Sequence, residues 1–117
     1  MAVWCADDEW CPVTCTLKLI GNKWHPVIIH RLLVHDELGF NALSDEIGGV
    51  TNKVLSDSLD DLEEKGLVER EIVQEKPVRV SYSLTDRGES LEDVIAALES
   101  WGEEYLRPAD GDGTAEC

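Results

Sequence analysis

Apolar side chains recur at helical spacing in two segments near the start of the chain. The first helix is predicted to begin after Cys11, its N-cap, with Pro12 as the first helical residue, because proline is favoured at that position. The pair Gly21-Asn22 ends this helix. A second apolar helix is predicted over residues 24–34. It accepts Pro26 near its start, because the first backbone N–H groups of a helix have no intrahelical partner.

The middle of the chain predicts a helix–turn–helix. A short helix over Phe40–Ile47 ends at Gly48-Gly49, and Thr51 caps a longer one. Lys65-Gly66 is a strong stop signal, because a cation suits the last helical turn and glycine suits the position beyond it. The apolar positions of the longer helix fall at i, i+4 and i+7: Leu55, Leu59 and Leu62.

Two strand-like runs and a final helix complete the pattern. The strands are predicted over Leu67–Val73 and Val78–Leu84, joined by Gln74–Pro77, and the second alternates between apolar and polar side chains. A single helix is predicted to open at Thr85-Asp86. Its apolar residues form one stripe: Leu91, Val94, Ile95, Leu98, Trp101 and Tyr105.

The order helix, helix, helix–turn–helix, hairpin, helix is that of a winged helix-turn-helix domain. We therefore predict an α+β fold with a two-stranded wing and flanking N- and C-terminal helices. We assign residues 1–10 to an N-terminal arm and residues 11–107 to the domain. Residues 108–117 are assigned to a mobile acidic tail, because they are rich in glycine and acids and have no apolar period.

The composition excludes several classes of protein. No apolar run approaches the roughly 18 residues that span a bilayer, and four cysteines are too few to replace the core of a secreted disulfide protein. No nucleophile elbow, phosphate loop or metal motif is present. We therefore expect a single cytoplasmic domain that does not associate with a membrane. We also expect it to have no enzymatic activity and no cofactor.

The chain is strongly acidic, with 10 Lys and Arg against 25 Asp and Glu and a net charge of −15. Three windows contain no acid: residues 10–35, 47–56 and 76–85. A protein this acidic ordinarily repels nucleic acid, so these windows require an explanation. The acid excess and the scarcity of lysine favour a halophilic, salt-adapted protein, because at about 1 M salt distant carboxylates hardly repel one another. The alternative is an ordinary acidic, solvated surface.

Six segments resemble the HxlR-type transcriptional regulators, and the likeness extends from about Cys11 to Tyr105. In order they are CPV at 11–13, LIGNKW at 19–24, FNAL at 40–43, LSDSLDDL at 55–62, GLVER at 66–70 and YSLTDRG at 82–88. Each is weak alone, but their order and spacing together are specific, and the acidic composition suggests a haloarchaeal-like member. The chain departs from the family in a less basic recognition region and in two additional cysteines, Cys5 and Cys15.

The resemblance implies a homodimeric regulator that binds double-stranded DNA at a near-palindromic operator. It also implies that the first and last helices make much of the dimer contact. The apolar residues that we assign to this contact are Val13, Leu17, Leu98, Trp101 and Tyr105.

The second helix of a helix-turn-helix inserts its N-terminal residues into the major groove. Lys53 could contact a guanine edge or a phosphate, Asn52 an adenine edge and Asp57 a cytosine amino group. The alternative is an amphipathic helix that is merely structural. At the hairpin, Lys76 and Arg79 could lie along phosphates or enter a minor groove, or could be ordinary solvated turn residues. The predicted DNA-contact set is Thr51, Asn52, Lys53, Ser56, Asp57, Lys76 and Arg79.

Cys11 is the candidate redox residue. A thiol at a helix N-terminus lies near free N–H groups and the positive end of the helix dipole, which lower its pKa. Several family members resemble thiol sensors that use the cysteine of this segment. Cysteines at i and i+4, such as Cys11 and Cys15, aim poorly at one another, so a bond from Cys11 to Cys5 or to the partner subunit is easier. The alternative is that Cys11 only caps and packs.

No metal site is expected. The spacing of the three N-terminal cysteines matches no standard zinc pattern. Steps of five residues place the histidines on different faces of a helix: His25, His30 and His35. The tryptophans are expected in the core or the dimer interface. Whether a small-molecule effector binds between the dimer helices is left open by the sequence. The alternative function is a winged-helix protein–protein interaction module without specific DNA binding, which the net charge and the acidic end of the recognition helix favour.

Overall fold

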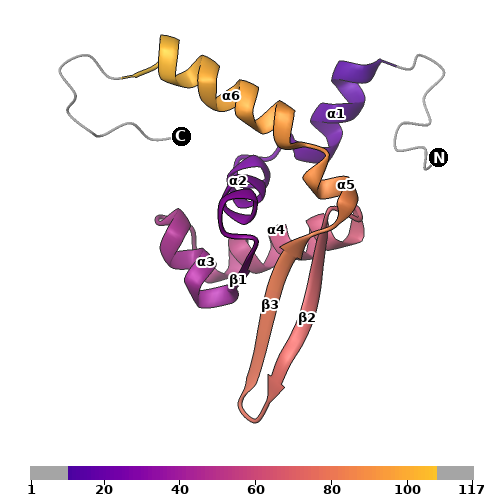
Figure 1. Ribbon diagram of the computed structural model, residues 1–117, viewed down its shortest axis with the longest axis vertical. Helices are drawn as coiled ribbons and strands as arrows, with labels where there is room; N and C mark the ends of the chain where they lie inside the picture. The colour runs from indigo at the N-terminus through magenta and orange to yellow at the C-terminus, as the bar shows by residue number, and fades with distance from the viewer. Residues whose placement is uncertain (1–10, 108–117) are drawn as a thin grey trace.

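The computed structural model describes residues 11–107, so the arm and tail assigned from the sequence lie outside it. Helices and strands are arranged as an α+β fold (Figure 1). The helices are α1 (Pro12–Ile20), α2 (His25–His35), α3 (Phe40–Ile47), α4 (Asn52–Glu64), α5 (Asp86–Glu89) and α6 (Glu92–Tyr105). The strands are β1 (Glu37–Gly39), β2 (Val68–Glu75) and β3 (Val78–Leu84).

The helix boundaries follow local signals. Cys11 precedes α1 as its N-cap residue, with proline in the first turn, and α3 has the predicted bounds. Thr51 caps α4, because its hydroxyl oxygen accepts a hydrogen bond from the N–H of Val54 at 3.2 Å. These helix predictions are confirmed.

The sheet contains a strand that the sequence analysis missed. Its order is β1-β3-β2, and all pairs are antiparallel. The three-residue β1 pairs with Ser81–Ser83 of β3, at a distance in sequence that no local pattern reveals. The hairpin also continues beyond the predicted end, because β2 runs to Glu75 and leaves only Lys76-Pro77 as the turn.

The predicted single C-terminal helix is wrong, because the structure divides it into α5 and α6. Thr85 caps the short α5, accepting from the N–H of Gly88 at 3.1 Å and donating to the carbonyl of Gly66. These bonds hold α5 against the chain between α4 and β2. A Cβ atom at Gly88 would lie 2.2 Å from the carbonyl oxygen of Leu67. This close approach redirects the chain before α6 begins.

The core surrounds α2, which packs against α3, α4, α6 and β3. Figure 1 shows α1 and α6 at one end of the molecule, and α3, α4 and the projecting β2–β3 hairpin toward the other. The predicted leucines of α4 are fully buried. The largest fully buried apolar side chains are Ile28, Ile29, Leu32, Leu43, Leu55, Leu59, Leu62 and Leu67. None of the described helices combines the length and apolar character needed to cross a membrane.

The outer sides of α1 and α6 keep large apolar side chains in solvent. Trp101 remains 57% exposed and stacks at a tilt on Tyr105, with 5.1 Å between ring centroids. Ile95, by contrast, points into the core and does not share the exposed stripe. All five residues predicted for the dimer contact are exposed: Val13, Leu17, Leu98, Trp101 and Tyr105.

Candidate nucleic-acid interface

The turn between α3 and α4 depends on two glycines. Gly48 and Gly49 have φ angles of 70° and 76°, in the region that residues with a Cβ atom rarely adopt. The turn brings the chain back so that Leu43 of α3 and Leu55 of α4 both join the core. The start of α4 is thereby placed at the surface, on a rigid support.

The predicted contact residues on α4 lie together on its exposed side. Because α4 buries its leucines and Ser58, the intervening positions face solvent. The exposed residues include every position predicted on this helix: Thr51, Asn52, Lys53, Ser56 and Asp57. Their chemistry includes an amide, two hydroxyls, one cation and one carboxylate, which suits both phosphate contacts and base edges.

Lys53 is paired within α4. Its Nζ donates to Oδ2 of Asp57 at 3.0 Å, one helical turn away. Both side chains are largely exposed, so this ion pair contributes little to stability and is easily exchanged for another partner. The sequence contained the signal for this pair, because residues four apart on a helix are neighbours.

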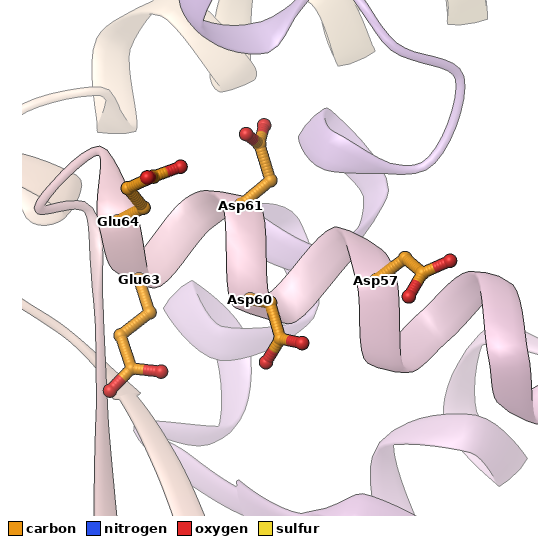
Figure 2. Close-up of a pocket in the computed structure, with 5 residues that line it drawn as sticks. All are labelled: Asp57, Asp60, Asp61, Glu63 and Glu64. Atoms are coloured by element: carbon orange, nitrogen blue, oxygen red, sulfur yellow. The ribbon is translucent and has the colours of Figure 1, made fainter.

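The far end of α4 is acidic. Asp57, Asp60, Asp61, Glu63 and Glu64 line a shallow hollow of about 550 Å³. Figure 2 shows that their side chains leave the helix in different directions and do not converge on one point. Throughout residues 11–107, no three His, Cys, Asp or Glu side chains are grouped so that they could hold a metal ion. The acidic end of α4 is therefore a solvated surface.

The β2–β3 hairpin projects away from the core (Figure 1). Lys76 lies in its turn, and Arg79, near the start of β3, pairs across the ladder with Gln74. Both cations are exposed. Apolar side chains near the tip are exposed as well, with Val78 at 67%. The hairpin thus presents two exposed cations near its tip, next to Glu75 at the end of β2.

Two further cations in the acid-free window at residues 10–35, Lys23 and Arg31, have local roles. The ammonium of Lys23 lies 4.7 Å from the ring centre of Trp24, which packs against the core. Arg31 bonds the carbonyl of Glu46 on α3 and the ring of His30. Trp10 lies outside the described residues. Neither cation belongs to the exposed face of α4.

The three histidines of α2 contact three different helices, and they share no face of α2, as their spacing predicted. His30 contacts Glu99 of α6 at 3.4 Å, and His35 contacts Glu46 of α3 at 3.0 Å. His25 is almost completely buried, and its Nε2 lies 2.7 Å from Oδ2 of Asp61. Sequence reasoning missed these partners, because only the packing of the helices brings them together.

Asp61 belongs to a small charged network. Burial alone raises the pKa of Asp61, but hydrogen bonds from Lys65 and His25 outweigh it and hold the pKa below its ordinary value of 3.8. The Lys65 ammonium lies 2.9 Å from the same carboxylate oxygen. The charged form of Asp61 is therefore favoured in the folded protein.

Replacing Asp61 with asparagine is expected to remove an acid-sensitive part of the stability. Because the pKa is lowered on folding, the carboxylate stabilises the fold above its unfolded pKa, and this contribution is lost as the pH falls through the lowered value. The difference in Tm between wild type and Asp61→Asn should be largest near neutral pH and should shrink below about pH 4. Thermal unfolding across this range measures it, with the exposed neighbour Asp60→Asn as control. A difference independent of pH would contradict the prediction.

The N-terminus of α1 carries a free thiol. Hydrogen bonds from the backbone N–H and hydroxyl of Thr14, and from the N–H of Val13, lower the pKa of Cys11. Cys11 is partly exposed and free, whereas Cys15 is disulfide-bonded. The expected bond from Cys11 to Cys5 is therefore not the one present, and Cys5 itself lies outside the described residues. Cys15 lies on the buried side of α1, whereas Cys11 at the start of the helix is partly exposed.

Comparisons with known proteins agree with this geometry. The HxlR-like helix-turn-helix family matches residues 19–110. The chain is 37% identical over 99 residues to YdeP of Bacillus subtilis, named an uncharacterized HTH-type transcriptional regulator, covering 85% of this chain and 77% of YdeP. It is 32% identical over 104 residues to the HTH-type transcriptional regulator YodB of the same organism, covering 88% of this chain and 92% of YodB.

The similar solved structures include the redox regulator HypR in two states. The oxidised form matches with a TM-score of 0.74 and 34% identity, covering 80% of this chain and 96% of HypR. The reduced form matches with a TM-score of 0.75 and 33% identity, covering 80% and 92%. The winged-helix architecture derived above is thus shared with these proteins.

Proposed function

Because the chain belongs to the HxlR-like helix-turn-helix family, we propose that it is a transcriptional regulator that binds a near-palindromic operator as a homodimer. The observation that carries this proposal is the exposed, polar start of α4, in the same half of the molecule as the projecting hairpin. The relatives YdeP and YodB are both named HTH-type transcriptional regulators, which supports the same function.

The start of α4 is the proposed reading surface. In a helix-turn-helix these residues reach base edges in the major groove. Lys53 exchanges its ion pair with Asp57 for a contact to a guanine edge or a phosphate, because breaking an exposed ion pair requires little free energy. Asn52 then faces an adenine edge and Asp57 a cytosine amino group. Lys76 and Arg79 contact the phosphates or the minor groove beside the site.

The apolar faces of α1 and α6 are the proposed dimer contact. Monomeric proteins rarely leave large apolar side chains gathered in solvent, yet α1 exposes Val13 and Leu17, and α6 exposes Leu98, Trp101 and Tyr105. A twofold dimer through this end leaves both copies of α4 free at the other end (Figure 1). Twofold symmetry in the protein then requires near-palindromic symmetry in the DNA.

Introducing charge into this face is expected to separate the dimer. The double variant Leu17→Glu with Leu98→Glu should sediment as a monomer and bind a whole operator no better than a half-site, because buried carboxylates without partners oppose association. Analytical ultracentrifugation measures the mass. Val34→Glu is the control, because it replaces a similarly exposed apolar residue on α2, outside the proposed contact. This variant should remain dimeric. A double variant that stays dimeric would exclude this interface.

Regulation by oxidation at Cys11 is the second part of the proposal. The lowered pKa favours the reactive thiolate at the N-terminus of α1, beside the proposed dimer contact. Oxidation would join Cys11 to a second thiol, while the oxidant takes up two electrons and two protons. Such a crosslink would alter the spacing between the two recognition helices. The similar protein HypR is described as a redox regulator, which supports this reading.

The variant Cys11→Ser is expected to bind DNA like reduced wild type and to lose any response to oxidant. Both properties are measured by monitoring DNA binding with fluorescence anisotropy, before and after mild oxidation. Cys117→Ser removes a thiol from the tail and serves as the matched control, which should keep the wild-type response. An unchanged oxidant response in Cys11→Ser would exclude Cys11 as the sensor.

We further propose a salt-adapted, cytoplasmic regulator without catalytic activity. A net charge of −15 opposes the approach to phosphates unless added cations screen it. DNA binding normally weakens steeply with salt, because phosphate contacts release counter-ions. Here few cations are available for such contacts, so the affinity should vary little with KCl or even rise. A steep loss of affinity with KCl would contradict salt adaptation.

A protein–protein interaction module is the second candidate function. The acidic end of α4, with its five exposed or partly exposed carboxylates, is the observation that favours it. Such a module would not depend on Lys53 or Arg79, which distinguishes it from the DNA-binding regulator.

A further inference from the structure

Lys65 joins the recognition helix to the helix that carries the proposed dimer contact. It is the C-cap residue of α4, and its ammonium donates to the carbonyl oxygens of Lys18 at 3.0 Å and Leu19 at 3.4 Å. Both carbonyls belong to the last turn of α1. The side chain of Lys65 is only 22% exposed, although lysine is ordinarily a surface residue.

The chemistry of this contact is specific. The last four carbonyls of a helix have no intrahelical partner, and the C-terminal end of the helix dipole favours a positive charge. Lys65 supplies both the donors and the charge, from a different helix. Its ammonium has three donors, and the carboxylate of Asp61 accepts at 2.9 Å beside the two carbonyls. Lys65 therefore ties the end of α1 to the end of α4.

Asp61 extends this connection to α2. Its Oδ2 also receives a hydrogen bond from Nε2 of His25, the first residue of α2, at 2.7 Å. The other ring nitrogen of His25 is buried and has no hydrogen-bond partner within the described part of the chain. Asp61 thus makes the shorter of two polar contacts to Nε2, and the side-chain amide of Asn22 lies 3.4 Å from the same atom. The ends of α1, α2 and α4 meet in one network of Lys65, Asp61 and His25, which we call the Lys65 network.

The Lys65 network lies at the junction between α1, which belongs to the proposed dimer contact, and the recognition helix α4. On the proposed function, α1 lies in the dimer contact, and the start of α4 enters the DNA. The distance and angle between the two copies of α4 in a dimer then depend on how each α4 is held against its own α1. The core residues of α4 fix the helix on α2, but α1 projects from the body with much of its surface exposed (Figure 1). A charged bond at this junction restricts its angle.

We propose that Lys65 is a specificity-determining positioning residue, which holds α4 against α1 and thereby sets the half-site spacing that the dimer accepts. This inference rests on the proposed function. Lys65 acts through the orientation of α4, because it lies at the opposite end of that helix from the predicted base contacts. Its loss should broaden the range of spacings accepted, rather than only weaken binding.

The test compares operators that differ in the spacing of their half-sites by one base pair in either direction. We expect wild type to prefer one spacing and Lys65→Met to lower the ratio of affinities between preferred and altered spacing by roughly tenfold, the size expected for a hydrogen bond to a charged group. Lys65→Arg keeps donors and charge and should restore the preference. Glu64→Gln, an exposed neighbour, should keep the wild-type ratio.

The outcomes separate this inference from the proposed function. Wild type that binds no operator overturns both. Wild type that binds but shows no spacing preference, or a Lys65→Met protein that keeps the wild-type ratio, overturns the role of Lys65 alone. Circular dichroism and Tm establish that the variants fold. Should Lys65→Met not fold, Lys65→Gln removes the ammonium that donates to the two α1 carbonyls, and an unchanged ratio there would equally exclude the proposal.

Discussion

Replacing both Lys53 and Arg79 with alanine is expected to lower operator affinity by roughly 100-fold or more, because each contact to a base edge or phosphate contributes on the order of 1–3 kcal/mol. Lys53 is the cation on the exposed start of α4, and Arg79 is exposed near the tip of the hairpin. Fluorescence anisotropy with a labelled operator measures the loss.

The control for this double variant must remove the same charge elsewhere. Lys18→Ala with Arg107→Ala changes the net charge equally at the end of the molecule that carries α1 and α6. It should stay within about threefold of wild type, since it leaves the proposed DNA contacts intact. An equal loss in both double variants would show that net charge alone governs binding. Unaltered affinity in Lys53→Ala with Arg79→Ala would place the DNA contact elsewhere.

Replacing Gly88 with alanine is expected to destabilise the fold by about 3 kcal/mol, the upper part of the range for overpacking a core. The added Cβ would lie 2.2 Å from the Leu67 carbonyl oxygen and 3.1 Å from Cδ2 of Leu84. The carbonyl cannot yield easily, because it accepts a hydrogen bond from the N–H of Thr85 at 3.1 Å. For a domain of this size the expected drop in Tm is roughly 10–20 °C.

Gly102→Ala is the matched control for this prediction. A Cβ atom at Gly102 would meet no atom within 4 Å, and the residue lies inside α6. Alanine is favoured over glycine in a helix by about 0.5–1 kcal/mol, so this variant should be as stable as wild type or slightly more stable. Thermal and urea unfolding of both variants give the comparison. A Gly88→Ala protein with wild-type Tm would show that α5 can move away from Leu67.

Most helix boundaries could be predicted because the signals for them are local. Cys11 with Pro12 marks the start of α1, Thr51 marks the start of α4, and Gly48-Gly49 ends α3. Each of these signals acts through backbone groups within one helical turn. The strands β2 and β3 were likewise evident from their composition, although the wing proved longer than predicted.

The features that the sequence did not reveal depend on tertiary contacts. Strand β1 forms because β3 offers it an edge, and nothing within Glu37–Gly39 itself indicates a strand. The break between α5 and α6 arises where Gly88 meets Leu67, two residues that are distant in the chain. An apolar stripe that continues across such a break still reads as one helix, and for this reason the single-helix prediction failed.

The candidate site likewise combines features that follow from local sequence patterns with features that depend on tertiary packing. The exposed face of α4 followed from the period of its buried leucines. The pair of Lys53 with Asp57 was not predicted, although its i, i+4 spacing is a local signal for it. The Lys65 network was not visible, because its members come from two helices and a helix end that approach only in the fold. Three-dimensional packing, rather than any motif, makes Lys65 a candidate for setting specificity.

The most direct test of the account is the binding of the reduced, wild-type protein to fragments selected from its source genome, in high KCl. The account predicts that a near-palindromic fragment is retained in the presence of excess unrelated DNA. It also predicts that protection from cleavage covers two half-sites related by twofold symmetry. Retention of no fragment above unrelated DNA at any KCl concentration would contradict a sequence-specific regulator.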